Sequence, residues 1–239
     1  LLVYIILALT FGYTLIMAET SLGRMTRKSP VGAFESFGNS RFISIGGWIN
    51  AIIPILIVPY YSVIGGWVIK YLIEYFAGHS KTLAGDAYFT TFISNGWSTE
   101  ICFIIFTLFT LGIIYAGVRN GIERVSKFMM PILIVLSLII AVYSVTRPGA
   151  IEGVKYFLVP NFDHFSWMTV VSAMGQMFYS LSIAMGILIT FGSYMKKDTS
   201  IEKSTENVEI FDTAIAIMAG LMIIPAVFAF SGGNAETLK

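Results

Sequence analysis

Asp212 stands inside a long apolar stretch near the C-terminal end of the sequence. If a helix begins near Glu202, Asp212 lies about 15 Å along it, at about 1.5 Å per residue. That position is close to the centre of a lipid bilayer. A carboxyl group at such depth must be protonated, paired or bound to an ion. If the helix begins nearer Ile210, Asp212 lies at the membrane interface instead. The first alternative makes Asp212 an ion-binding or proton-carrying candidate.

An uncharged polar cluster lies in the preceding apolar stretch, in Gly175–Gly186. It carries a glutamine, a tyrosine and two serine hydroxyls between flanking glycines. Two interpretations stay open. Small and hydroxyl residues let helices pack closely in lipid. Alternatively, the helix is broken here, and the freed carbonyls and hydroxyls bind an ion or a substrate.

Two further polar positions lie in apolar stretches. Glu19, at the end of the first stretch, either anchors a buried network or is simply interfacial. In the second stretch Pro59 precedes Tyr60 and Tyr61, and a proline inside a helix frees a carbonyl and favours a kink. Ordinary aromatic packing is the alternative interpretation of the two tyrosines.

Three acidic residues precede Asp212 with helical spacing, at i, i+4 and i+7: Glu202, Glu206 and Glu209. We expect them to form a solvated cytoplasmic face, where they also suit the positive end of the helix dipole. A role in an ion exit path is the alternative.

No motif for catalysis is present. The sequence lacks HExxH, GxSxG, P-loop and CxxC patterns, so we expect no enzyme activity. His79 and His164 are isolated loop histidines, and the single Cys102 allows no disulfide within the chain. The net charge of +1 gives no electrostatic basis for binding nucleic acid.

The elements that carry these residues are predicted to be membrane-spanning helices. Of the 239 residues 56% are hydrophobic and 12% are charged, whereas soluble domains have about 25% charged residues. Six stretches approach the roughly 20 apolar residues that a spanning helix needs: 1–18, 47–76, 101–117, 128–145, 167–193 and 202–230. We expect one transmembrane domain over 1–239, with the segment from Gly153 to His164 packing back on it. Because the chain opens directly in an apolar run at Leu1, without a basic segment, we expect that this run is not a signal peptide and that the chain is truncated at its front.

Basic residues set the predicted orientation. The loops after the first, third and fifth stretches hold ten of the fifteen Lys and Arg residues. The positive-inside rule therefore places these three loops in the cytoplasm and both chain ends outside.

An ordered set of sequence strings resembles the neurotransmitter:sodium symporter family, especially its bacterial amino-acid transporters of the leucine-transporter fold. The strings are Ala18–Arg24, Tyr60-Tyr61 with Gly66-Trp67, Gly121–Arg124, Lys127–Pro131, Gly175–Gly186, Ser193-Tyr194, and Asp212 with Gly220 and Pro225. The resemblance covers essentially the whole chain. It implies an all-α, polytopic membrane protein with about six transmembrane helices and a partial inverted-repeat fold. The chain would correspond to helices two to seven of a larger transporter of this family, and as such a fragment it should not transport by itself.

The resemblance also implies roles for single residues. Tyr61 matches the tyrosine that binds the substrate carboxylate, and Ile57 matches an apolar wall of the same pocket. Four residues of the broken helix match the pocket, with the first as an aromatic lid: Tyr179, Ser180, Ser182 and Met185. Ser180 and Asp212 match sodium ligands. Tyr194 matches a tyrosine of the cytoplasmic gate.

Four residues match the surroundings of the chloride site in animal members: Tyr4, Gln176, Ser180 and Asp212. A sodium ion in a low dielectric needs a nearby negative charge, and we hypothesise that Asp212 supplies it, so that chloride is not required. A second hypothesis is that Asp212 takes up a proton in the inward-facing state.

The sequence thus predicts a sodium-coupled symporter of an amino acid or a similar small zwitterion, multi-pass in the cell membrane. Its partners would be sodium, the substrate and the lipid bilayer. Two alternatives stay open. One is a proton-coupled transporter of the same fold, and the other is a non-transporting scaffold, regulatory protein or non-functional fragment. Neither the particular amino acid nor the oligomeric state follows from the sequence.

Overall fold

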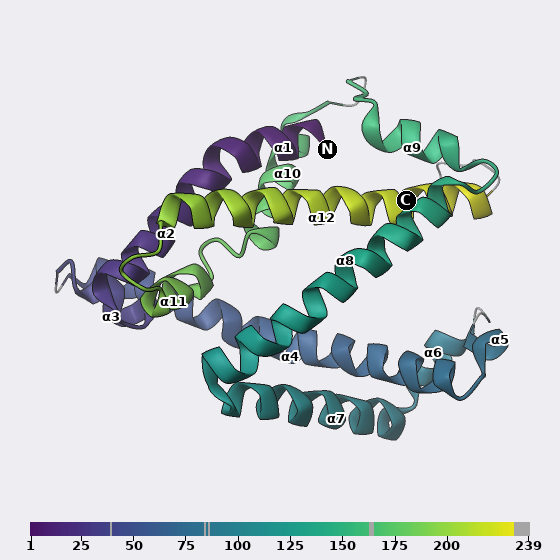
Figure 1. Cartoon of the computed structure of the whole chain (residues 1–239), viewed down its shortest axis with the longest axis horizontal. Helices are drawn as coiled ribbons and strands as arrows, with labels where there is room; N and C mark the ends of the chain where they lie inside the picture. Colours follow the sequence, from purple (N-terminus) through teal and green to yellow (C-terminus); the bar gives the residue numbers. More distant parts are fainter. Residues whose placement is uncertain (39, 84, 86, 163–164, 232–239) are drawn as a thin grey trace. The chain divides into compact units, whose positions relative to one another are not determined.

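The computed structural model describes residues 1–38, 40–83, 85, 87–162 and 165–231. The chain divides into two compact units, one made of Leu1–Ala51 and Pro131–Lys239, the other of Ile52–Met130. Every regular element in the described part of the chain is a helix, which confirms the all-α prediction (Figure 1).

Five helices are long and apolar enough to cross a membrane: Leu2–Thr26, Arg41–Phe76, Gly96–Tyr115, Asn120–Val145 and Ile201–Phe230. They cover five of the six predicted stretches. The remaining stretch forms two shorter helices, α10 (Trp167–Ser180) and α11 (Ile187–Tyr194), which are separated by a non-helical segment. The chain is therefore a multi-pass helical membrane protein in which one crossing is interrupted.

The first long helix of the larger unit is built from three consecutive pieces. These are α1 (Leu2–Leu7), the π-helical turn η1 (Ala8–Gly12) and α2 (Tyr13–Thr26). The helix ends where Arg27 adopts a left-handed conformation with φ of 55°. Ser29 then caps the short helix α3 (Pro30–Glu35), whose proline at the first position suits a helix start.

The α2 helix packs closely against α11. A Cβ atom added at Gly23 would overlap the backbone of Ile189, and one added at Gly192 would overlap the backbone of Thr20. Small residues at such a crossing let two helix backbones approach, which is the main source of packing energy between helices in lipid. Glycines at these two positions therefore join α2 and α11 tightly.

Arginine side chains at the end of α2 bind the loop that joins α11 to the last helix, α12 (Ile201–Phe230). Arg24 donates hydrogen bonds to the carbonyl oxygens of Thr199 and Lys197, and Arg27 donates one of 2.9 Å to that of Ser193. Ser200 caps α12 by accepting a hydrogen bond from the Lys203 N–H. These contacts fix where α12 begins.

The α12 helix, yellow-green in Figure 1, also packs against α9 (Ala150–Leu158). A Cβ atom at Gly153 would lie 2.8 Å from Cα of Pro225, so the two helices meet closely there. Gly149, with φ of 83°, forms the turn that follows the end of α8 (Arg124–Val145). The predicted packing of this segment on the bundle is confirmed through Leu158, whereas His164 lies outside the described residues.

The second unit contains most of α4 (Arg41–Phe76), the short helices α5 (Ser80–Leu83) and α6 (Tyr88–Ser94), α7 (Gly96–Tyr115), and the π-helical turn η2 (Val118–Glu123). A Cβ atom at Gly66 of α4 would lie 2.8 Å from the backbone nitrogen of Phe103 on α7, so these helices also cross closely. The Trp67 ring contacts the Phe89 ring edge to face at 5.1 Å and ties α6 to α4.

Candidate functional site

The segment between α10 and α11 has an unusual backbone conformation. Ser182 and Ala184 have φ of 55° and 61°, and Gly186 has φ of 68°. A residue with a side chain rarely adopts this left-handed region, and such strain persists only where surrounding contacts maintain it. The structure therefore supports the broken-helix interpretation over plain helix packing.

Two side chains from neighbouring helices hold the interrupted segment. Oε1 of Glu19 on α2 accepts a hydrogen bond of 2.7 Å from the N–H of Ala184. Oδ1 of Asn50 on α4, within the same unit, accepts one of 3.1 Å from the N–H of Gly186. Both bonds satisfy backbone donors that the helix would otherwise satisfy itself. Glu19 therefore anchors a buried network, which was one of its two predicted roles.

Asp212, on α12, contacts the end of α10, where the break begins. Its helix begins at Ile201, so the alternative start near Ile210 is wrong and Asp212 is about 16 Å along the helix. Its Oδ2 accepts a hydrogen bond of 2.8 Å from Ser180 Oγ and one of 3.2 Å from the Tyr4 hydroxyl. Ser180 is the last residue of α10, so the carboxylate joins α1, α12 and the end of the broken helix.

An apolar cluster lies around these polar groups. Tyr4, Ala8 and Ile16 of the first long helix pack against Met177, Leu181 and Ile183. All six side chains are buried. Tyr4 therefore belongs both to this cluster and, through its hydroxyl, to the Asp212 contacts.

The other predicted site residues of this unit lie near the break. Tyr179 is in the last turn of α10, with 43% of its surface exposed. Ser182 and Met185 are half-buried within the non-helical segment. Gln176 lies one turn before Ser180 on α10, but its side chain is exposed. Tyr194 is the last residue of α11 and is exposed.

Ile57 and Tyr61 belong to the second unit. They lie one turn apart on α4, between Pro54 and the close crossing at Gly66. Ile57 is half-buried, and Tyr61 is 49% exposed, with its ring edge to face with that of Tyr60 at 5.7 Å. Tyr61 thus presents much of its side chain at the surface of its own helix.

Glu209 is buried, although its helical spacing with Glu202 and Glu206 predicts that it belongs to a solvated face. Glu202 and Glu206 are exposed, as a solvated face requires, but Glu209 is only 4% exposed. Its Oε1 has no hydrogen-bond partner among the described residues. The spacing of the three carboxylates does not distinguish them, because burial depends on how α12 packs against other elements, and α12 contacts both α2 and the η1 turn.

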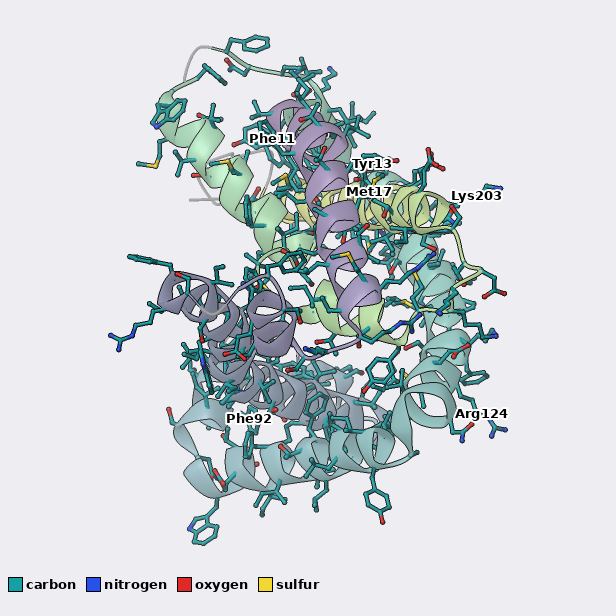
Figure 2. The ribbon with its side chains drawn as sticks, turned by 90° about the vertical axis from the view of Figure 1, so that its left-hand side faces the viewer. Phe11, Tyr13, Met17, Phe92, Arg124 and Lys203 are labelled. Carbon is teal, nitrogen blue, oxygen red and sulfur yellow. The ribbon has the colours of Figure 1, made fainter. Side chains whose placement is uncertain are left out.

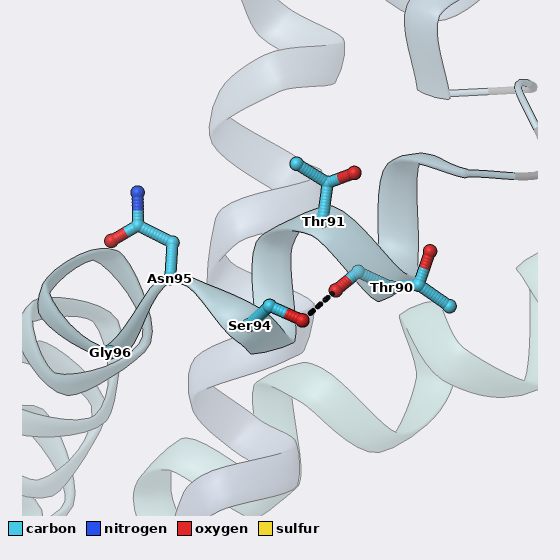
Figure 3. A pocket seen from close by; sticks show the side chains of 5 residues that line it. All are labelled: Thr90, Thr91, Ser94, Asn95 and Gly96. Atoms are coloured by element: carbon cyan, nitrogen blue, oxygen red, sulfur yellow. Dashed lines mark hydrogen bonds between the residues drawn. The ribbon is translucent and has the colours of Figure 1, made fainter.

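A separate hollow on the second unit is lined by Thr90, Thr91, Ser94, Asn95 and Gly96 (Figure 3). Its polar side chains mostly form hydrogen bonds with nearby backbone groups. Ser94 Oγ donates to the Thr90 carbonyl, and Asn95 Oδ1 caps α7 by accepting from the Ser98 N–H. Within the described ranges no three His, Cys, Asp or Glu residues gather as they would around a metal ion. The hollow contains none of the predicted site residues.

Comparison with known proteins agrees with this geometry. A sequence profile described as the sodium:neurotransmitter symporter family matches residues 89–237. An uncharacterised sodium-dependent transporter of Bacillus subtilis, YhdH, is 32% identical over 96% of this chain and 51% of its own length. The human sodium- and chloride-dependent transporter XTRP3 is 24% identical over 92% of this chain and 42% of its own length.

The crystal structure of the protein MhsT in complex with L-phenylalanine matches with a TM-score of 0.89 and 35% sequence identity. The match covers 96% of this chain and 53% of that one. The chain thus spans about half the length of the relatives it matches. Because the family profile matches well over half of the sequence, the chain belongs to the sodium:neurotransmitter symporter family, a family of transporters and not of enzymes.

Proposed function

We propose that the protein containing this chain is a sodium-coupled symporter that carries an amino acid or a similar small zwitterion across the cell membrane. The chain would act as part of one transmembrane domain, in which alternating access exposes a midplane site to each side in turn. Three comparisons support the proposal: the family profile, the bacterial relative named for sodium dependence, and the similar fold solved with L-phenylalanine.

The observation that carries the proposal is the broken helix beside Asp212. Strained backbone at bilayer depth is tolerated where it is buried in protein or lines a cavity. Here the break follows Ser180 directly, and the Ser180 hydroxyl contacts the Asp212 carboxylate. Hydroxyl and carboxylate oxygens are hard ligands of the kind that alkali and alkaline-earth cations prefer. Sodium would bind where these two side chains meet.

The substrate site would be formed by the residues that match the family's pocket. The Tyr61 hydroxyl would bind the substrate carboxylate, which would also face the bound sodium. The substrate side chain would rest on Ile57, Tyr179 and Met185, with Ser182 lining the same pocket. Met adapts its shape readily, so the pocket would accept a bulky side chain. Tyr194 would close the path to the cytoplasm.

Chloride would not be required. Asp212 carries a full negative charge and already accepts hydrogen bonds from Tyr4 and Ser180, two of the groups expected around an anion. An added anion beside this carboxylate would be repelled.

The experiment is uptake of a mixture of radiolabelled amino acids into liposomes that hold the full-length protein. An inward sodium gradient should drive accumulation, and an equal potassium gradient should not. Accumulation that ignores sodium but follows pH would favour a proton-coupled transporter of the same fold. Well-folded protein that accumulates no amino acid would contradict the proposal.

A further inference from the structure

Asn50 on α4 has both polar atoms of its side-chain amide engaged. Its Oδ1 accepts the hydrogen bond of 3.1 Å from the Gly186 N–H, and its Nδ2 donates one of 3.0 Å to the Gly46 carbonyl oxygen, one turn earlier on α4. Because a backbone N–H only donates and a carbonyl only accepts, both contacts require the same orientation of the amide. Asn50 belongs to the part of α4 that lies in the larger unit, as the break does. The amide therefore joins the backbone of α4 to the beginning of α11.

Gly186 lies in a confined place at that junction. A Cβ atom there would lie 2.7 Å from Pro30 Cγ on α3 and 3.0 Å from the backbone oxygen of Asn50. The φ of 68° and the lack of room both favour glycine. The carbonyl of this buried residue accepts a hydrogen bond of 3.0 Å from the Thr190 N–H in the first turn of α11. Without the Asn50 side chain, the Gly186 N–H would be buried with no acceptor in its place.

The backbone on both sides of Met185 is held by side chains. On one side Glu19 of α2 accepts the hydrogen bond of 2.7 Å from the Ala184 N–H (Figure 2 labels Met17 on the same helix). On the other side the Gly186 N–H donates to the α4 amide. The direction in which a side chain leaves the chain is set by the conformation of its backbone. The two acceptors therefore determine together where the half-buried Met185 side chain lies.

We propose that Asn50 is a positioning residue of the substrate pocket. Through the Gly186 N–H it fixes the place of the Met185 side chain, and this sets which substrate side chains the pocket accepts. Asn50 acts through the backbone of the break and not by touching the substrate. The inference rests on the proposed function, in which Met185 lines the pocket, and it adds a source for the selectivity of that pocket.

The proposed sodium site should be spared when this contact is lost. The contact of Ser180 with Asp212 lies at the α10 end of the break, whereas Gly186 directly precedes α11. Glu19 holds the segment between these two ends. Loss of the Asn50 contact should therefore change the fit of the substrate side chain and leave the sodium dependence of uptake in place.

Three variants of Asn50 separate the two hydrogen bonds of its amide. Asn50→Ala removes both. Asn50→Ser keeps a hydroxyl that can bond the Gly46 carbonyl within the helix, but this side chain is too short to reach Gly186. Asn50→Asp keeps an acceptor oxygen for the Gly186 N–H. The matched control is Asn95→Ala, because Asn95 Oδ1 also accepts from a backbone N–H, that of Ser98 at 3.3 Å, in the other unit.

The first measurement is hydrogen–deuterium exchange of the peptide covering residues 183–188 in the full-length protein in lipid. Asn50→Ala and Asn50→Ser should raise its exchange several-fold, because the Gly186 N–H loses its acceptor. Asn50→Asp and Asn95→Ala should stay near the wild-type rate. Asn50→Ser decides the result if Asn50→Ala folds poorly. Exchange in Asn50→Ser equal to that of the wild type would overturn the positioning role, whatever the protein transports.

The second measurement is KM for a bulky and a small amino acid, L-phenylalanine and L-alanine, in sodium-driven uptake into liposomes. The ratio of the two KM values should differ several-fold from the wild-type ratio in Asn50→Ser and stay near it in Asn50→Asp and Asn95→Ala. This ratio does not depend on how much of the protein is folded, so a purely structural role would not change it. An unchanged ratio in Asn50→Ser would overturn the inference alone. A wild type that takes up neither amino acid would contradict the proposed function and, with it, this role of Asn50.

Discussion

Ser180 donates a hydrogen bond of 2.8 Å to Asp212, and through it the end of a broken helix is fixed to the middle of a continuous one. The Tyr4 hydroxyl binds the same carboxylate oxygen at 3.2 Å. Two hydroxyl donors on one oxygen keep the carboxylate in one orientation.

Chloride independence is the first prediction. Uptake by the full-length wild type should be unchanged when gluconate replaces chloride, because Asp212 already supplies the negative charge. In Asp212→Ser the charge is lost while a hydroxyl remains, so uptake should become dependent on chloride. Wild-type uptake that collapses in gluconate would show that the carboxylate does not replace the anion.

Tyr61 and its neighbour Tyr60 provide a matched pair of variants. If the Tyr61 hydroxyl binds a charged substrate carboxylate, Tyr61→Phe should raise KM by about 10- to 100-fold, because a hydrogen bond to a charged group contributes roughly 1.5–3 kcal/mol. Tyr60 is 59% exposed, and Tyr60→Phe should leave KM nearly unchanged. Equal effects of the two substitutions on KM would argue against the assigned role.

Glu19 should control the order of the interrupted segment. Glu19→Ala leaves the Ala184 N–H without its acceptor, which should destabilise the segment by about 1–3 kcal/mol. Glu19→Gln keeps an acceptor oxygen and should have a smaller effect. Hydrogen–deuterium exchange of the peptide covering residues 181–186 should rise strongly in the alanine variant alone. Exchange equal to that of the wild type would mean that Glu19 does not hold the break.

The α2–α11 crossing should depend on its glycines. Gly23→Ala places a Cβ atom on the Ile189 backbone and should destabilise the protein by about 1–3 kcal/mol, as overpacking does. At Gly112 of α7 an added Cβ meets no atom within 4 Å. Gly112→Ala should therefore be neutral or stabilise by up to about 1 kcal/mol, from its helix propensity. Thermal unfolding of both variants in detergent measures the difference.

The sequence predicts the helical elements well because a membrane span is determined by the length of an apolar run. The interruption of the fifth stretch was only one of two interpretations, because glycines and serines serve close packing as readily as a broken helix. Left-handed conformations at Ser182 and Ala184 have no signal in residue type, since neither residue favours them.

The burial of a single side chain between helices is also hard to predict from the sequence. Glu209 has the same spacing and chemistry as exposed Glu202 and Glu206, and only the packing of α12 in the folded chain separates it from them. Nothing in the sequence singles out Asn50, which binds Gly186, because its partner lies far along the chain. By contrast, the residue type alone makes Asp212 a candidate, because an aspartate is rare in an apolar stretch.

The central claim is that sodium binds where Ser180 meets Asp212, and its direct test is the sodium dependence of thermal stability in the full-length protein. A ligand that binds only the native state stabilises it by RT ln(1 + [L]/Kd), so Tm should rise with sodium. The same concentration of choline should leave it unchanged. Ser180→Ala and Asp212→Asn should lose most of the sodium-dependent rise, whereas Ser193→Ala, at the end of α11, should keep it. Equal sodium-dependent rises in Tm in all four proteins would contradict the claim.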